Sequence, residues 1–196
     1  MRKLLLACCF VGLTAQFSLA EIVVAVGDHD VLANTANQQI DVLVSTDGGQ
    51  SPTIFGSNLH FQLADGTGPI VEPVFNGFSI DGSIFDVTGS GTAGGVVGGG
   101  QFIDASATPP AAGVDANGIL VSLLIDTTGI TSGTFALSGT ITEGGANLPT
   151  QLLDGNAAAR TLVINDGSVT ISAVPEPSSV VIVVAFGGIV LCRRRR

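Results

Sequence analysis

The sequence contains no tryptophan and no tyrosine, and phenylalanine is its only aromatic residue. Sugar-binding surfaces usually present exposed aromatic rings, so this absence argues against a glycan platform of that kind. Hydrogen bonds from Asn and Asp side chains can still bind a polysaccharide. Cysteine is scarce as well, because Cys8, Cys9 and Cys192 all lie near the two ends. The central part of the chain therefore has neither a disulfide nor thiol chemistry.

Basic residues are almost absent from the central part of the chain. Between Glu21 and Val174 there are fifteen Asp or Glu residues and one base, Arg160, which gives a formal charge of −14. Such an acidic domain repels phosphate backbones, which excludes nucleic acid as a partner. The carboxylates indicate either simple solubility outside the cell or binding of a divalent cation such as calcium. Apart from that calcium alternative, we expect no cofactor.

Sequence patterns for catalysis are also missing. The only histidines are His29 and His60, and no G-x-S-x-G motif is present. His60 alternates with apolar residues, which predicts that it faces outward from a strand. His29 lies in the polar connection 28–30, whose two carboxylates and one imidazole form a thin set of metal ligands. The segment 89–94 matches G-x-G-x-x-G, but no helix follows it, so we interpret 89–100 as a mobile glycine-rich loop. We therefore expect no enzyme.

Glycine is abundant, with 27 residues, and Asp-Gly and Asn-Gly pairs recur between runs of alternating apolar residues. These pairs favour tight turns, and the alternation is typical of strands with one buried face. The expected strands are 22–26, 40–45, 59–63, 70–75, 84–88, 102–107, 119–125, 134–142, 161–164 and 169–171. The best helical candidate, 151–160, is short. The pattern predicts an all-β, antiparallel β-sandwich of about ten strands, jelly-roll-like, over residues 21–173.

The N-terminus has the three parts of a secretory signal peptide. Arg2 and Lys3 form a positive region, an apolar stretch follows, and residues 18–20 form a small-x-small cleavage site. The sequence therefore predicts a signal helix over residues 1–20 and cleavage between Ala20 and Glu21. Such a signal implies that the domain is exported.

The C-terminal segment 174–196 combines an extended motif, an apolar run and a basic end. The run 180–192 would be about 20 Å long as a helix, shorter than the roughly 30 Å hydrocarbon core of a membrane. It is followed by Arg193, Arg194, Arg195 and Arg196. Arginines resist translocation, so they should act as a membrane stop with the C-terminus in the cytoplasm. The run is a marginal transmembrane helix, suited to transient anchoring.

Pro175, Glu176 and Pro177 precede this run, and the prolines hold an extended backbone that a processing enzyme can accept. The order of these features resembles the PEP-CTERM sorting signal. The resemblance implies that an exosortase, a membrane-embedded processing enzyme, recognises Pro175, Glu176 and Pro177. It implies an intermediate anchored in the inner membrane, followed by display at the cell envelope, on the surface or in the extracellular matrix. An ordinary tail anchor is the alternative, and the motif transfers no function to the central domain.

The central domain is similar to cohesin-like modules, a superfamily that includes related carbohydrate-binding domains. The similarity rests on an apolar strand followed by a glycine-bearing one, 118–126 and 133–142, and on the closing segment 165–171. It implies a β-sandwich that binds a partner, although no contact residues can be transferred. We expect a non-enzymatic surface or matrix protein; the alternative is a cohesin-like binding module for a polysaccharide or a protein, with calcium as a possible aid.

Overall fold

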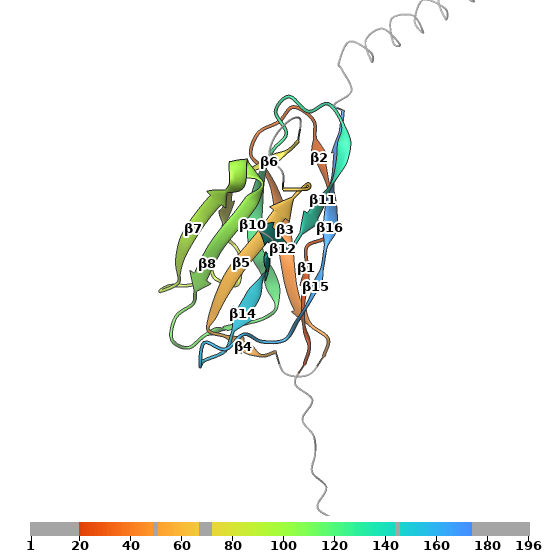
Figure 1. The fold of residues 1–196 in the computed structure, drawn as a ribbon. Helices are drawn as coiled ribbons and strands as arrows, with labels where there is room; N and C mark the ends of the chain where they lie inside the picture. The colour runs from red at the N-terminus through yellow and green to blue at the C-terminus, as the bar shows by residue number, and fades with distance from the viewer. Residues whose placement is uncertain (1–19, 49–50, 67–71, 144–145, 174–196) are drawn as a thin grey trace, which may run out of the picture.

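The computed structural model describes residues 20–48, 51–66, 72–143 and 146–173, which form two β-sheets packed face to face (Figure 1). The strands are β1 (Ile22–Ala25), β2 (Asp28–Leu32), β3 (Gln38–Thr46), β4 (Thr53–Ile54), β5 (Gly56–Leu63), β6 (Val74–Ser79), β7 (Gly91–Val97), β8 (Phe102–Thr108), β9 (Val114–Asp115), β10 (Gly118–Asp126), β11 (Gly133–Ser138), β12 (Thr140–Glu143), β13 (Ala146–Pro149), β14 (Gln151–Leu153), β15 (Leu162–Asn165) and β16 (Gly167–Ser172). A single 3-10 turn, η1 (Gly98–Gly100), joins β7 to β8.

Two large sheets contain most of these strands. The five-stranded sheet has the order β15-β1-β3-β10-β6. The seven-stranded sheet has the order β2-β16-β11-β5-β8-β7, and β14 pairs with β5 alongside this path. Two small pairs, β12-β13 and β4-β9, complete the described part of the chain. The all-β sandwich predicted from the sequence is therefore confirmed.

The core lies between the two large sheets and follows the alternation in the sequence. On β3 the side chains of Ile40, Val42 and Val44 are buried, while the residues between them point outward. On β5 the inward residues are Leu59, Phe61 and Leu63, all fully buried. Full burial of a side chain of this size contributes about 1.5–3 kcal/mol. A strand whose apolar residues occupy every second position has one possible orientation in such a sandwich, and this orientation decides which polar residues face solvent.

The antiparallel prediction is wrong for two strand pairs. β1 runs parallel to β15, and β2 runs parallel to β16. Parallel strands must be joined by a long connection, and here nearly all of the domain lies between the paired strands in the sequence. β2 itself begins in the polar stretch interpreted as a connection. Its outward carboxylates fit an edge strand, where charged side chains discourage pairing with other chains.

Three further segments differ from the sequence-based expectation. The glycine-rich segment 89–100 contains β7, which pairs with β8 from Gly91 to Val97 and forms an edge of the seven-stranded sheet. Segment 84–88, expected to be a strand, consists of turns. Its apolar residue Phe85 is nevertheless fully buried, within a turn closed by a hydrogen bond from Asp86 N to Ser83 O of 3.0 Å. The helical candidate 151–160 is also absent, since β14 begins there.

The terminal predictions fall largely outside the described residues. Residues 1–19 of the predicted signal helix 1–20 lie there, as do Pro175, Glu176, Pro177, the run 180–192 and the four terminal arginines. Within the described ranges, no helix has the length and apolar character needed to cross a membrane. The predictions for both ends remain predictions from the sequence.

Candidate functional site

The outward side of four neighbouring strands, β14, β5, β8 and β7, carries the candidate site, which we call the β5–β8 face. Because Leu59 and Phe61 point into the core, Asn58 and His60 point to solvent from β5. Antiparallel pairing sets His60 directly opposite Asp104 of β8 and sets Asn58 opposite Ser106. Directly opposite residues on one face of a sheet are close enough for their side chains to interact.

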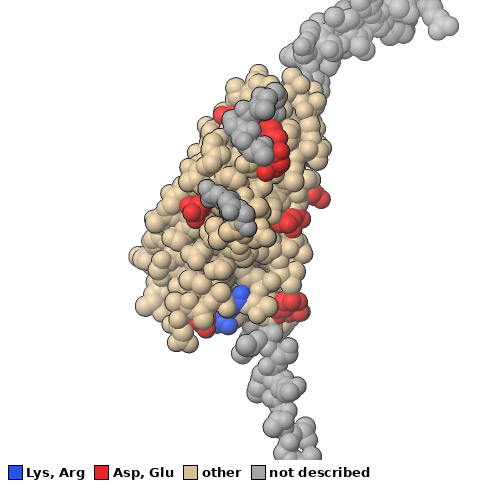
Figure 2. Space-filling model, in the orientation of Figure 1, with Lys and Arg blue, Asp and Glu red and all other residues tan. Residues whose placement is uncertain are grey.

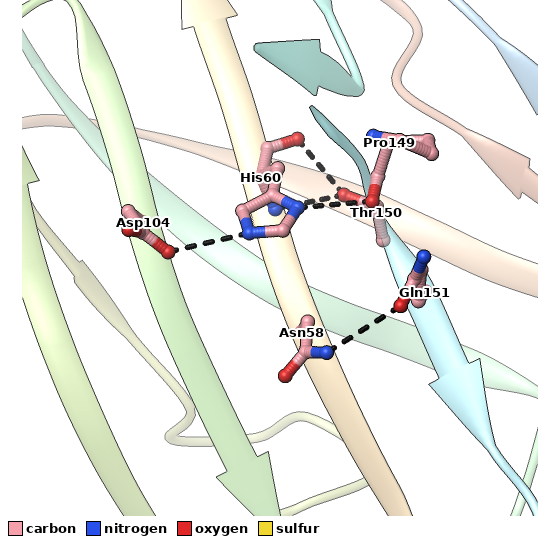
Figure 3. Close-up of polar contacts among 6 residues, drawn as sticks. All are labelled: Asn58, His60, Asp104, Pro149, Thr150 and Gln151. Carbon is pink, nitrogen blue, oxygen red and sulfur yellow. Dashed lines mark hydrogen bonds and ion pairs between the residues drawn. The ribbon is translucent and has the colours of Figure 1, made fainter. Parts of the chain in front are cut away.

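The imidazole of His60 lies between two oxygen atoms (Figure 3). Its Nε2 is 3.3 Å from Oδ1 of Asp104, and its Nδ1 is 2.9 Å from the carbonyl oxygen of Pro149. The His60 side chain is 14% exposed, whereas that of Asp104 is 59% exposed. Both ring nitrogens therefore face acceptors, one of which carries a charge and remains open to solvent.

Thr150 fixes the backbone on which His60 stands. Its hydroxyl is buried, accepts a hydrogen bond from His60 N at 2.9 Å and donates one to His60 O at 2.8 Å. A side chain thus satisfies both backbone groups of His60 at the point where β13 gives way to β14. Beside it, Asn58 Nδ2 donates to Gln151 Oε1 at 3.5 Å (Figure 3). These hydrogen bonds fix the positions of His60 and Asn58 on the β5–β8 face.

β7 forms a floor with very small side chains next to Asp104. Its outward residues include Ala93, opposite Ser106, and Gly95, opposite Asp104. Gly94 has φ +109°, and a Cβ there would collide with the backbone of Asp104 and Ala105. Only glycine allows β7 to approach β8 this closely. The result is a shallow depression of ≈ 300 Å³ lined by Asn58, Ala93, Gly94, Asp104, Ala105 and Ser106.

A second hollow, of ≈ 460 Å³, lies at the end of the domain where the described chain begins. Glu21, Asp154 and Arg160 are among its lining residues. Figure 2 shows the only blue side-chain atoms in view at this lower end, while acidic side chains are spread over the visible face, this end included. The Nη2 of Arg160 donates to the carbonyl oxygen of Thr53 at 3.3 Å.

The acidic group of Asp154 in this second hollow is engaged in local structure, while the buried Nε of Arg160 has no hydrogen-bond partner among the described residues. The Asp154 carboxylate accepts hydrogen bonds from the backbone N–H groups of Ala158 and Asn156, which lower the pKa of Asp154 below its usual range. This carboxylate therefore closes its own turn. The β5–β8 face, whose Asp104 is not used in this way, is the stronger candidate for a site.

Of the residues singled out from the sequence, Ala20 and Glu21 lie at the start of the described chain. The backbone N of Glu21 donates to Asp47 Oδ1 at 2.8 Å. His29 belongs to β2, and its Nε2 lies 2.8 Å from the carbonyl oxygen of Val26. No group of three or more His, Cys, Asp or Glu side chains that could hold a metal occurs in the described ranges.

The prediction that His60 faces outward is confirmed. Asp104 and Ser106 were not singled out from the sequence, although both occupy polar positions in an alternating strand. That signal identifies outward residues but does not identify their neighbours, because the pairing of β5 with β8 is a property of the fold.

Comparison with known proteins gives a match at the level of fold. No protein-family model and no curated protein matches the sequence. Among solved structures, a non-cellulosomal cohesin from the archaeon Archaeoglobus fulgidus matches with a TM-score of 0.53 and 16% identity, covering 82% of this chain and 96% of the cohesin. The cohesin of a type I cohesin–dockerin complex from Clostridium thermocellum matches with a TM-score of 0.54 and 13% identity, covering 82% and 99%. A type I cohesin of Pseudobacteroides cellulosolvens matches with a TM-score of 0.50 and 11% identity, covering 81% of this chain and 97% of the cohesin. The described domain therefore has the fold of cohesin modules.

Proposed function

We propose that this chain is a non-catalytic module that binds a protein partner on its β5–β8 face. The observation that carries the proposal is the polar arrangement built on that face. A polar pair, His60 and Asp104, stands on a fixed backbone beside a floor of small residues. Rigid strands preorganise such a surface, so a partner gains contacts there without ordering a loop.

Several features favour a protein over a polysaccharide. The phenylalanines of the central strands, Phe61 on β5 and Phe102 on β8, are buried and offer no ring for stacking. The floor made by β7 lets a partner's backbone come close to the sheet. Cohesins of similar fold are found in complexes with dockerins, and this likeness supports a dockerin-like protein as the first partner to test. Calcium would enter with such a partner or at a separate site.

Matched substitutions on the two sheets test this proposal. Ser106→Arg places a long side chain in the middle of the β5–β8 face, and Ser45→Arg places the same side chain on β3, on the outer face of the five-stranded sheet. The immobilised full-length protein is probed with purified dockerin modules and with the extracellular proteins of the organism that encodes the chain. We expect wild type and Ser45→Arg to retain the same protein, and Ser106→Arg to lose it. Equal retention by the two variants, or retention by neither variant nor wild type, would contradict the proposal.

We further propose that the module is delivered to the cell envelope through its two ends. The support is the sequence alone, with a signal peptide cut between Ala20 and Glu21 and the sorting motif Pro175–Pro177 before the arginine cluster. Replacing Glu176 with Ala should leave the anchor intact and cause precursor to accumulate in the membrane. Mass spectrometry of surface-located protein gives the decisive reading, since an intact Arg196 would indicate a plain tail anchor.

A further inference from the structure

The residues that line the depression beside Asp104 are suited to binding one positively charged side chain. Asp104 is the only acidic residue on β5, β7, β8 and β14, and none of these strands carries Lys or Arg. Within the described residues, His60 is the only side chain that forms an ion pair or hydrogen bond with its carboxylate. Around the same depression, Asn58 and Ser106 supply further polar oxygen atoms. Carboxylate, amide and hydroxyl oxygens together satisfy the several N–H donors of a guanidinium or ammonium group.

The shape of the depression fits the stem of such a side chain. Ala93 and Gly94 line it on the β7 side, and neither projects beyond a methyl group. A long aliphatic stem can therefore lie across β7 with its charged end at Asp104. Arg and Lys side chains commonly bury their stems along such surfaces while the charged head remains at the polar end.

His60 competes for the same carboxylate. In a neutral imidazole only one ring nitrogen carries a proton, while the other presents a lone pair. With Nδ1 donating to Pro149 O, the neutral ring turns the lone pair of Nε2 towards Asp104 Oδ1, and the two do not attract each other. The protonated ring donates to both oxygens. Asp104 is thus paired within the face when His60 is protonated and is available when His60 is neutral.

No other ionisable side chain on the described strands that pack against β5 lies near His60 and Asp104. Among the strands that pack against β5, the strands β11, β13 and β14 contain no ionisable side chain, and β8 contributes only Asp104. Glu143 ends β12, where it pairs with Ala146 at the end of the hairpin opposite to Pro149. The electrostatics of the depression therefore depend on one imidazole and one carboxylate.

We propose that the partner of this module inserts an arginine or lysine side chain into the depression beside Asp104, and that protonation of His60 closes this subsite. The proposal rests on the proposed function, since it names the chemistry by which the β5–β8 face recognises its protein. Recognition by charge at this point gives specificity as well as affinity, because a partner with a carboxylate in the same place would be repelled.

A small probe tests the subsite without the natural partner. The full-length protein, labelled with ¹³C at the aspartate carboxyl groups and with ¹⁵N, is held in detergent and titrated with N-acetyl-arginine methylamide, followed by NMR. We expect the Asp104 carboxyl and the Gly94 and Ala105 amides to shift, with a dissociation constant on the order of millimolar, because one partly exposed ion pair contributes little. N-acetyl-glutamine methylamide, which lacks the charge, should leave these signals in place.

Variants separate the carboxylate from the competing imidazole. Asp104→Asn should abolish the response, whereas Asp115→Asn, at an exposed acid on β9, should retain it. For wild type we expect affinity about threefold weaker near pH 5 than near pH 8.5, because a protonated His60 competes for Asp104. His60→Gln should bind at both pH values with equal affinity.

Three outcomes would overturn the inference: shifts located elsewhere, shifts that persist in Asp104→Asn, or a pH dependence that persists in His60→Gln. Retention of a partner by wild type and Ser45→Arg but not by Ser106→Arg is measured independently. If the NMR signals around Asp104 do not shift, but wild type and Ser45→Arg retain a partner that Ser106→Arg does not, this inference is rejected and the proposed function stands.

Discussion

Asp41 on β3 and Asp104 on β8 both point outward from a large sheet, but their surroundings differ. Asp41 Oδ1 accepts a hydrogen bond from Ser122 Oγ at 2.6 Å and another from Gln39 Nε2 at 3.1 Å. Gln39 also donates to Ser122 Oγ at 3.1 Å, which closes a three-membered network. Asp104 is contacted through the ring of His60 and is otherwise open to solvent. A carboxylate satisfied within its own sheet stabilises the fold, whereas one left open can bind a partner.

The small floor of β7 accounts for the accessibility of Asp104, and a substitution in it should have the largest effect. Gly94→Val adds a side chain that collides with Ala105 at a backbone angle of φ +109°. We expect β7 to separate from β8, with a loss of about 2–4 kcal/mol in the free energy of unfolding from strain and overpacking combined. Urea denaturation measures the loss.

The control is Gly95→Val, because nothing lies within 4 Å of a Cβ at that position. Its free energy of unfolding should change by less than about 1 kcal/mol, even though the new side chain stands beside Asp104. Similar losses in the two variants would mean that the tight approach at Gly94 does not hold β7 in place.

Removing each of the two compared carboxylates should separate their roles. Asp41→Ala leaves Ser122, a buried hydroxyl, without its strongest partner, and we expect a loss of about 1–2 kcal/mol in stability. Asp104→Ala should change stability by no more than about 0.5 kcal/mol, because exposed ion pairs contribute little. Thermal unfolding of both variants in parallel decides the matter, and an equal loss would remove the distinction drawn between the two aspartates.

Asp126 offers a third case, with the smallest expected effect. The side-chain hydroxyl of Thr128, followed by its backbone N–H, holds the pKa of Asp126 below its ordinary value of 3.8, with a further contribution from Asn76. Because the folded-state pKa is the lower one, the resulting stabilisation is present above about pH 4 and is lost as the pH falls through the folded-state pKa.

Thr128→Val removes the hydroxyl but retains the N–H, which donates at 2.8 Å. The pKa of Asp126 should rise towards 3.8 without reaching it. Carboxyl ¹³C NMR titration measures the change, with Thr134→Val on β11 as the control. An unchanged titration would show that the backbone alone sets the pKa of Asp126.

The alternation of apolar residues was sufficient to predict the central strands. Ile40, Val42 and Val44 on β3 and Leu59 and Phe61 on β5 are buried as expected. β7 was missed because its glycines, Gly91, Gly94 and Gly95, leave no alternation of apolar side chains to detect, and its conformation comes from pairing with β8. The turn around Phe85 produced the opposite error, since a loop that covers the core needs apolar residues as much as a strand does.

The sequence predicted one residue of the candidate site, His60, but not the residues around it. The period of β5 predicted an outward His60, but its partner Asp104 could not be assigned without the register between β5 and β8. The roles of Pro149 and Thr150 depend on a backbone contact between segments distant in the sequence, and no local pattern signals such a contact. Pairing between distant strands is therefore the information that the sequence did not provide.

The parallel strand pairs also constrain the order in which the domain can be completed. β1 and β2 are the first strands of the described chain, yet their neighbours β15 and β16 are the last, with Ile22 opposite Leu162 and Asp28 bonded to Ser168 across 140 residues. A chain that emerges from a ribosome or a membrane channel with its N-terminus first must keep one side of β1, and the whole of β2, unpaired until almost all of it has emerged. Contacts between such distant residues also slow folding, because the intervening loop must first be closed. Both sheets can therefore be completed only after the whole domain has emerged.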